Sequence, residues 1–243
     1  MNIPLEIPDI SEYGAVKETA RQKSDKRLFM QLLVFTECFS TENISKALQN
    51  SGLESVLYAN ANDPRGIGVL VLAEDPAVFT GKARAIFTSE PFRSLKALPD
   101  WTMIGRSYSS GFEQDLEDWL LRKPRRNLFN PAWNWAVWYP LRRNGAFEQL
   151  SKEEQRPILM EHAKIGMSYG QAEFAHDVRL ACHGLDAHDN EFLLGIISKE
   201  LYPISKLVQE MRKTQQTSKY IEQMGPFFVG HAIGRFGNET RKN

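Results

Sequence analysis

The feature that most constrains the fold is one order of elements, strand-helix-strand-strand-helix-strand, that occurs twice along the chain. Strands are predicted from apolar runs rich in β-branched and aromatic residues, and helices from amphipathic spacing. The first copy has predicted strands at residues 28–38, 54–60, 66–73 and 101–108, with helices that begin at Ser40 or Thr41 and at Asp75. The second copy has predicted strands at 133–139, 174–182, 190–198 and 226–233, with helices over 151–169 and 203–213.

Two copies of this order predict an α+β protein made of two ferredoxin-like units, each with an antiparallel sheet that carries both helices on one face. The other face of each sheet needs cover, so we expect the two sheets to pack together as a dimeric α+β barrel. The connection is the polar, basic segment 110–132, whose helical part is expected to end before Pro124. This places the N-terminal unit at residues 1–125 and the C-terminal unit at residues 126–243.

Composition and charge exclude several classes of protein. The 30 Lys and Arg residues are balanced by 30 Asp and Glu residues, so the chain lacks the basic surplus of a general nucleic-acid binder. No apolar run approaches the ~20 residues that span a bilayer, and the first residues have neither the basic stretch nor the apolar core of a signal peptide. Cys38 and Cys182 permit at most one disulfide. We therefore expect a cytoplasmic protein without a membrane span.

His162 is the first candidate functional residue. All five histidines lie in the C-terminal half of the chain. Ser151 and Glu154 form a capping box that opens a helix, and helical spacing places His162 on the side of that helix that carries Ile158 and Ile165. The inward-facing imidazole is either a buried neutral group with a backbone partner or an axial metal ligand, since neutral imidazole binds iron well.

Tyr139 is the second candidate, at the end of the aromatic strand WNWAVWY, which Pro140 is expected to stop. Its phenol either packs in the core or lies at the rim of a cavity, where it can donate a proton or an electron. Several arginines surround this strand and the last helix. Because a guanidinium binds carboxylates bidentately, they form either solvated basic faces or a grip on an acidic ligand.

Other kinds of site are not indicated. The run of His176, Asp177, His183, His188 and Asp189 has no spacing typical of a zinc site. The sequence also lacks a glycine-rich phosphate loop, a nucleophile elbow and a Cys-His nucleophile arrangement. Attention therefore stays on His162 and Tyr139.

Several segments together resemble the chlorite dismutase family, which includes the coproheme decarboxylases of bacterial haem synthesis. These segments are YPLRR, LSKEEQRPILMEHAKIGMSY, GLDAHDNEF, LVQEMRKTQQTSKY and GPFFVG, and they span roughly residues 133–230 in order. The resemblance implies a duplicated ferredoxin-like protein, often a homopentamer, with an iron porphyrin in the C-terminal unit.

The resemblance also implies roles for individual residues. His162 resembles the proximal ligand of the haem iron, and Tyr139 resembles the tyrosine that the decarboxylases oxidise to a radical near a propionate. The positions that resemble propionate contacts are Arg143, Arg212, Thr217 and, as a further contact, Arg125.

One part of the family pattern is missing. Chlorite dismutases have a distal arginine thirteen residues after the proximal histidine, where this chain has Ala175. A two-residue insertion before Gly184 shifts the register to Asp177. The nearest arginine is Arg179, and His176 is an alternative distal residue.

The function that the resemblance implies is decarboxylation of iron-coproporphyrin III (coproheme) to haem b with hydrogen peroxide. One alternative keeps the haem and changes the chemistry to chlorite dismutation or a peroxidase-like reaction. Another alternative is a haem-binding protein without turnover.

Overall fold

The computed structural model describes residues 7–237, and ten strands form its main sheet. The first unit consists of β3 (Phe29–Thr36), α1 (Glu42–Ser51), β4 (Glu54–Asn60), β5 (Ile67–Ala73), α2 (Arg84–Phe87) and β7 (Met103–Ser107). The second unit consists of β8 (Trp135–Arg143), α4 (Lys152–Gln171), β9 (His176–Ala181), β10 (Phe192–Ser198), α5 (Leu201–Met211) and β12 (Phe228–Phe236). A π-helical turn, Phe79–Ala83, precedes α2.

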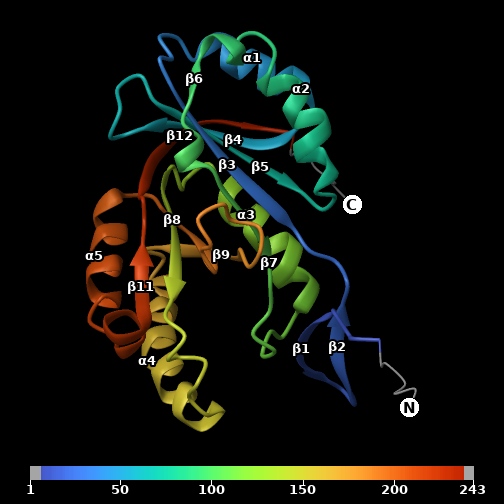
Figure 1. Ribbon diagram of the computed structural model, residues 1–243, viewed down its shortest axis with the longest axis vertical. Coiled ribbons are helices and arrows are strands. Elements are labelled where there is room, and N and C mark those ends of the chain that lie inside the picture. Colours follow the sequence, from blue (N-terminus) through green and yellow to red (C-terminus); the bar gives the residue numbers. More distant parts are fainter. Residues whose placement is uncertain (1–6, 238–243) are drawn as a thin grey trace, which may run out of the picture.

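The two units have the same sheet topology and together form a closed barrel. Their spatial orders are β7-β3-β5-β4 and β12-β8-β10-β9, so the last strand lies beside the first in each unit. Antiparallel pairs β7–β9 and β4–β12 join the edges of the two sheets. In Figure 1, α1 and α2 lie beside the first sheet at the top, and α4 and α5 lie beside the second at the lower left. The prediction of a duplicated ferredoxin-like α+β barrel is confirmed.

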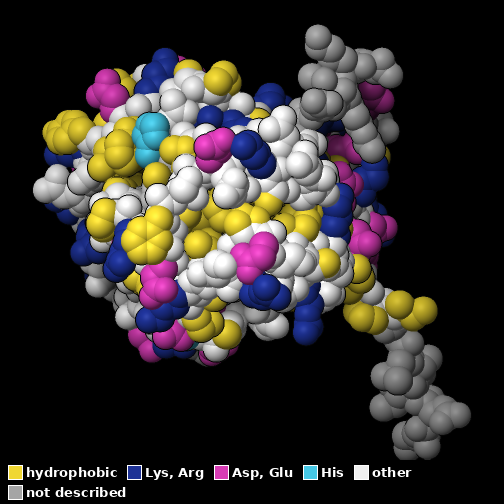
Figure 2. All heavy atoms as spheres, turned by 90° about the horizontal axis from the view of Figure 1, so that it is seen from above, with side chains coloured by type: hydrophobic (Ala, Val, Ile, Leu, Met, Phe, Trp, Pro, Cys, Tyr) yellow, Lys and Arg dark blue, Asp and Glu magenta, His cyan; other side chains and the backbone are white. Residues whose placement is uncertain are grey.

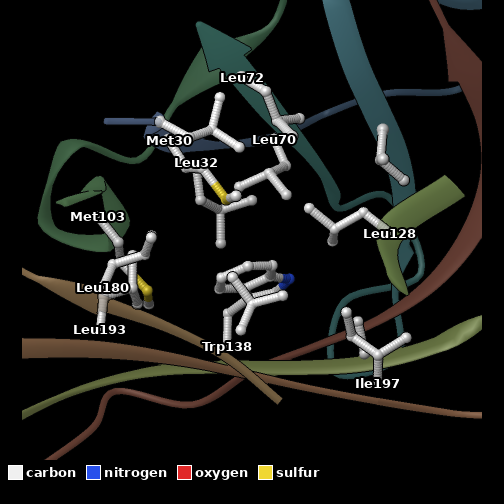
Figure 3. Packing of buried hydrophobic residues seen from close by; sticks show 14 of the residues in the cluster. Met30, Leu32, Leu70, Leu72, Met103, Leu128, Trp138, Leu180, Leu193 and Ile197 are labelled. Atoms are coloured by element: carbon white, nitrogen blue, oxygen red, sulfur yellow. The ribbon is translucent and has the colours of Figure 1, made fainter. Parts of the chain in front are cut away.

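The barrel interior is filled by apolar side chains from both units. Trp138 is fully buried there and lies below Leu32 and Leu70 of the first unit (Figure 3). Strand β5 is buried at every position because Leu70 faces this interior while Val69 faces the helices of the first unit. A third apolar cluster lies between the second sheet and helices α4 and α5. The unit boundary at residues 125 and 126 falls within α3 (Lys123–Phe129) and stays a prediction.

Pro140 does not stop its strand, contrary to the sequence-based expectation. Strand β8 continues through Pro140 to Arg143, and the Pro140 carbonyl accepts a hydrogen bond from the Gly225 amide at 2.9 Å. In an antiparallel strand the amide and carbonyl of one residue point to the same side. The missing amide therefore faces the break between β11 (Ile221–Met224) and β12, where no ladder bond is lost.

Pro124 does not end the connecting helix either. A π-helical turn, Asp118–Arg122, leads into α3, which continues to Phe129 with Pro124 in its first turn. The proline stands at the junction of the two, directly after the Lys123 amide, which donates to the Asp118 carbonyl in the π-helical pattern. The expected helix end before Pro124 is therefore wrong, and helical structure continues beyond it.

A hairpin of β1 (Glu12–Lys17) and β2 (Ala20–Ser24) lies beside the barrel and was not predicted. Glu12 attaches the hairpin to β7 and to the segment after it. The Glu12 carboxylate lies 2.8 Å from Arg106 and accepts a hydrogen bond from the Ser109 amide at 2.9 Å. The Ala15 amide also donates to the Glu113 carbonyl at 2.9 Å. The short strand β6 (Lys96–Ala97) pairs with β3.

The visible surface mixes charges of both signs. Seen from above, Lys and Arg side chains are interspersed with Asp and Glu side chains, and hydrophobic side chains gather in a band across the middle (Figure 2). This face therefore has no large field of one sign. None of the helices within residues 7–237 combines the length and the apolar character needed to cross a membrane.

Candidate functional site

The candidate site lies on the outer face of the second sheet, which we define as the face of β8, β9 and β10 that packs against α4 and α5. Side chains alternate between the two faces of a strand. On β8, Trp138 enters the barrel core while Tyr139 joins the outer cluster. Leu194 of β10 pairs with Tyr139 on one side and with Arg179 of β9 on the other. Tyr139, Leu194 and Arg179 therefore form one cross-strand row on the outer face.

His162 projects from α4, half-buried, and its hydrogen bonding determines which ring nitrogen is free. Its Nδ1 lies 3.4 Å from Thr214 Oγ1. The Thr214 hydroxyl donates its proton to the Met211 carbonyl at 2.8 Å, so toward His162 it can only accept. Nδ1 therefore carries the proton and Nε2 keeps its lone pair. This is the tautomer that a metal ligand bound through Nε2 requires.

The electrostatic surroundings keep this imidazole neutral. Burial lowers the pKa of His162 from its ordinary value, and the nearby Arg179 guanidinium lowers it further. Asp177 and Glu161 act in the opposite direction but do not reverse the shift. A neutral imidazole is the form that binds a metal.

The lowered pKa predicts how the folding stability of the ligand-free protein depends on pH. The contribution of His162 is complete above its ordinary pKa of 6.5. As the pH falls from there to the lowered pKa, the unfolded chain binds a proton that the folded protein does not. The free energy of unfolding should then fall by at most about 1.4 kcal/mol per pH unit. Urea unfolding of wild type and His162→Gln between about pH 5 and pH 8 measures this slope. An equal slope in both proteins would contradict the prediction.

Tyr139 is a buried phenol without a hydrogen-bond partner. Its side chain is 3% exposed, and its ring stacks on Phe227 with the centroids 4.5 Å apart. Burial raises the pKa of Tyr139, although the neighbouring Arg212 guanidinium acts to lower it. No group within residues 7–237 forms a hydrogen bond with the hydroxyl. The phenol is therefore protonated, and its hydroxyl has no partner among the described residues.

The segment after α5 brings Arg212 near Tyr139 and Thr217 near Thr214, the partner of His162. Arg212 follows α5 and is exposed, and no carboxylate within residues 7–237 forms an ion pair with it. Thr217 lies in the π-helical turn Gln216–Tyr220, where its hydroxyl is 3.3 Å from that of Thr214. The Gln215 amide donates to Glu161 of α4 at 2.9 Å and holds this segment against the helix.

Arg143 reaches the same face but is already paired with carboxylates. Its guanidinium lies 2.9 Å from Glu148 and 3.3 Å from Glu191. It also lies over the rings of Phe147 and Phe192, at 4.6 and 4.9 Å from their centroids. A ligand carboxylate would have to replace one of these two partners.

Arg125 is not brought to this face. Its guanidinium lies 2.8 Å from Glu54 and 3.3 Å from Glu74, which belong to the first unit. This double ion pair joins α3 to the first residue of β4 and to the residue after β5. The role of Arg125 as a propionate contact stays a prediction, and the position of its side chain does not support it.

The donor set on the outer face fits a flat iron-binding group with acidic side chains. It combines an imidazole with a free Nε2, an unpartnered phenol and an unpaired guanidinium. On α4, Leu159 lies one turn before His162 and leaves 39% of its surface exposed, so apolar surface is available beside the imidazole. Within residues 7–237, no three His, Cys, Asp or Glu side chains gather as a metal cage. An iron held by a porphyrin needs only one such ligand.

Comparison with known proteins identifies the family. The family model described as chlorite dismutase matches residues 42–233, which is most of the chain. The chain belongs to the chlorite dismutase family. It is 28% identical over 171 residues to a coproheme decarboxylase of Oceanobacillus iheyensis, covering 61% of this chain and 67% of the relative.

Solved structures share the fold of this family member. A mutant chlorite dismutase from Candidatus Nitrospira defluvii has a TM-score of 0.68 at 14% identity, covering 85% of this chain and 92% of that chain. A heme-binding protein from Thermus thermophilus has a TM-score of 0.67 at 18% identity, covering 95% of this chain and 96% of that chain. These likenesses confirm the barrel architecture.

The chlorite dismutase fold of this chain also shows which residues of β9 face His162. Val178 and Leu180 enter the barrel core, so Asp177 and Arg179 point to the outer face. His176 points away from that face, since it stacks on Trp133 with centroids 3.9 Å apart. The alternative of His176 as a distal residue is therefore wrong. Neither Asp177 nor Arg179 was predicted as a site residue, although strand alternation would have placed them once one residue of β9 was assigned.

Proposed function

We propose that this protein decarboxylates iron-coproporphyrin III to haem b with hydrogen peroxide. The observation that carries the proposal is the unpartnered Tyr139 phenol on the same sheet face that His162 approaches from α4. The sequence similarity to a coproheme decarboxylase supports this choice within the family. Decarboxylation needs such a phenol, whereas porphyrin binding alone does not.

Each residue of the outer face has a role in this proposal. His162 Nε2 would bind the iron, and Thr214 would keep the imidazole in the required tautomer. Arg212 and Thr217, together with Arg143 once it exchanges a carboxylate partner, would hold propionates in register. Such positioning lowers the barrier because the reacting carbon is held beside the phenol. The bound iron porphyrin supplies the redox chemistry with peroxide.

The reaction balances without a further reactant. Each reacting propionate loses carbon dioxide, one proton and two electrons, and a vinyl group remains. Hydrogen peroxide accepts the two electrons with two protons, one from the propionate and one from the solvent, and becomes two waters. Tyr139 would take part by giving up its phenolic hydrogen and then taking a hydrogen atom from the propionate side chain.

The test is a titration of the protein with iron-coproporphyrin III, followed by peroxide and identification of the products by mass. We expect tight binding of coproheme and a stepwise loss of carbon dioxide and two hydrogens until haem b is formed. Bound coproheme that keeps its mass under peroxide would refute the decarboxylase and leave a haem-binding protein without turnover.

Chlorite dismutation is the second candidate because the structure places Arg179 on the outer face. The guanidinium lies close enough to His162 to lower its pKa, although it is not at the family's usual distance along the sequence. Oxygen release from chlorite by the haem-loaded protein, measured with an oxygen electrode, would favour this candidate. Its absence, together with haem b formation from coproheme, would favour the decarboxylase.

A further inference from the structure

One acidic side chain lies on the sheet opposite His162. Helix α4 packs against β9, and helical spacing turns His162 toward the sheet on the side that carries Ile158 and Ile165. On β9, Asp177 faces this helix because its neighbour Val178 enters the barrel core. Asp177 is the only acidic residue in β8, β9 and β10. A flat ligand bound through His162 therefore lies between α4 and the strand that presents Asp177.

Two further observations support this position of Asp177. The Asn127 side-chain amide donates to the Asp177 carbonyl at 3.1 Å and holds the backbone in place. Burial is the main cause of the pKa shifts of His162 and Tyr139, and the charge of Asp177 acts on both groups as well. Because such effects decline with distance, the carboxylate lies near both of them.

The Asp177 carboxylate is ionised and can still accept a hydrogen bond. Burial alone would raise the pKa of Asp177, but the charges of Arg179 and Lys123 lower it below its ordinary value. One oxygen lies 2.9 Å from Arg179 Nε, and the other lies 3.6 Å from Lys123 Nζ. A carboxylate has about four acceptor positions, so these two cations leave room for a further donor. The side chain is 44% exposed, so a small ligand can reach it.

The other ionisable groups that these strands present on the outer face are not proton acceptors. Tyr139 is a protonated phenol, and Arg143 and Arg179 are cations. Ser198 of β10 donates its hydroxyl proton to the Phe174 carbonyl. Asp177 is therefore the group of β8, β9 and β10 that can take a proton from a ligand on this face.

We propose that Asp177 moves a proton of bound hydrogen peroxide from one peroxide oxygen to the other. The carboxylate takes the proton from the oxygen nearer the iron and gives it to the outer oxygen. The O–O bond then breaks, and the outer oxygen leaves as water with the bonding electron pair. The two electrons that the other oxygen then needs come from the bound iron porphyrin and are replaced by the propionate that is decarboxylated. Asp177 ends unchanged. The choice of peroxide as the ligand rests on the proposed function.

The first experiment uses hydrogen cyanide as the probe and does not depend on turnover. Hydrogen cyanide loses its proton when it binds iron as cyanide, so a nearby proton acceptor speeds its association. In the haem b-loaded protein, Asp177→Asn should slow cyanide association at least about tenfold, measured by stopped-flow at the Soret band. Asp177→Glu, which keeps the carboxylate, should retain most of the wild-type rate. The melting temperature of each variant checks the fold.

The matched control for this experiment is Asp115→Asn. Asp115 also pairs with an arginine, Arg122 at 3.1 Å, but it lines the groove beside the β1–β2 hairpin. Cyanide should associate with this variant at the wild-type rate. The proposal is overturned if Asp177→Asn leaves the rate unchanged, or if Asp115→Asn slows it equally.

The second experiment follows the proposed reaction itself. With coproheme and peroxide, Asp177→Asn should form haem b at least about 100-fold more slowly than the wild type, while the Soret titration still shows coproheme binding. Haem b formation at the wild-type rate in this variant would also overturn the proposal. If the wild type forms no haem b but Asp177→Asn slows cyanide association, the proposed function is refuted and Asp177 remains the proton acceptor of the site.

Discussion

Replacing His162 with alanine should abolish tight binding of iron porphyrin. The imidazole is the one neutral nitrogen ligand that α4 presents to the outer face, and its Nε2 is free because Thr214 holds Nδ1. We expect the affinity for coproheme and haem b to fall at least about 100-fold, which corresponds to about 2.7 kcal/mol of binding free energy. Titration followed by the Soret absorption measures both the affinity and the loss of histidine ligation.

Two further variants make this result specific. His176→Ala removes a histidine on the neighbouring strand that points away from the outer face, so porphyrin affinity should not change. Thr214→Val removes the partner of Nδ1 and should weaken binding about tenfold, as is usual for groups that orient a metal ligand. An unchanged Soret band in His162→Ala would show that another group binds the iron.

Replacing Tyr139 with phenylalanine should abolish decarboxylation while leaving coproheme binding intact. The ring keeps its stack on Phe227, and the lost hydroxyl has no partner within the described residues, so the fold should be as stable as before. Haem b formation on peroxide addition should fall at least about 1,000-fold, or about 4 kcal/mol of activation free energy. Product masses after a fixed time measure the loss.

The matched control for Tyr139→Phe is Tyr169→Phe. Tyr169 packs against the same apolar cluster, and its hydroxyl lies 3.0 Å from Glu210, away from the predicted chemistry. This variant should form haem b at the wild-type rate. Full turnover in Tyr139→Phe would show that the phenol is not used, and equal losses in both variants would indicate damage to the cluster as a whole.

Hydrophobic pattern predicted most of the barrel. Strand β4 has the predicted bounds, and the capping box at Ser151 opens α4 as expected, with the Glu154 amide 3.3 Å from the Ser151 hydroxyl. Both features depend on local sequence alone. Strands β1 and β2 escaped prediction because they carry EYGAVK and ARQKS, which lack the alternating apolar residues of a typical strand. The continuation of β8 through Pro140 depends on a break in the neighbouring edge, which local sequence does not reveal.

The candidate site could be predicted only in part. Helical spacing placed His162 on an inner side, the aromatic strand made Tyr139 a candidate, and the family resemblance supplied the roles of Tyr139 and Arg212. Thr214 had no local signal, since it is 52 residues from His162 and meets it only through packing of the segment after α5. Arg125 shows the opposite failure: the sequence leaves its side chain free, whereas the fold pairs it with the distant Glu54 carboxylate. The roles of these residues and the pentamer stay predictions.

The pairing of β4 with β12 has a consequence for how the chain is made. Residues 55–60 must meet residues 230–236 before the barrel can close. While the protein emerges from the ribosome, the edge strands β4 and β7 of the first sheet have no partner strands. The apolar face of this sheet that later packs against Trp138 is also exposed to water. Closure joins segments far apart in sequence, which makes it a slow step. The nascent first half is therefore a natural client for chaperones until the last strand has been synthesised.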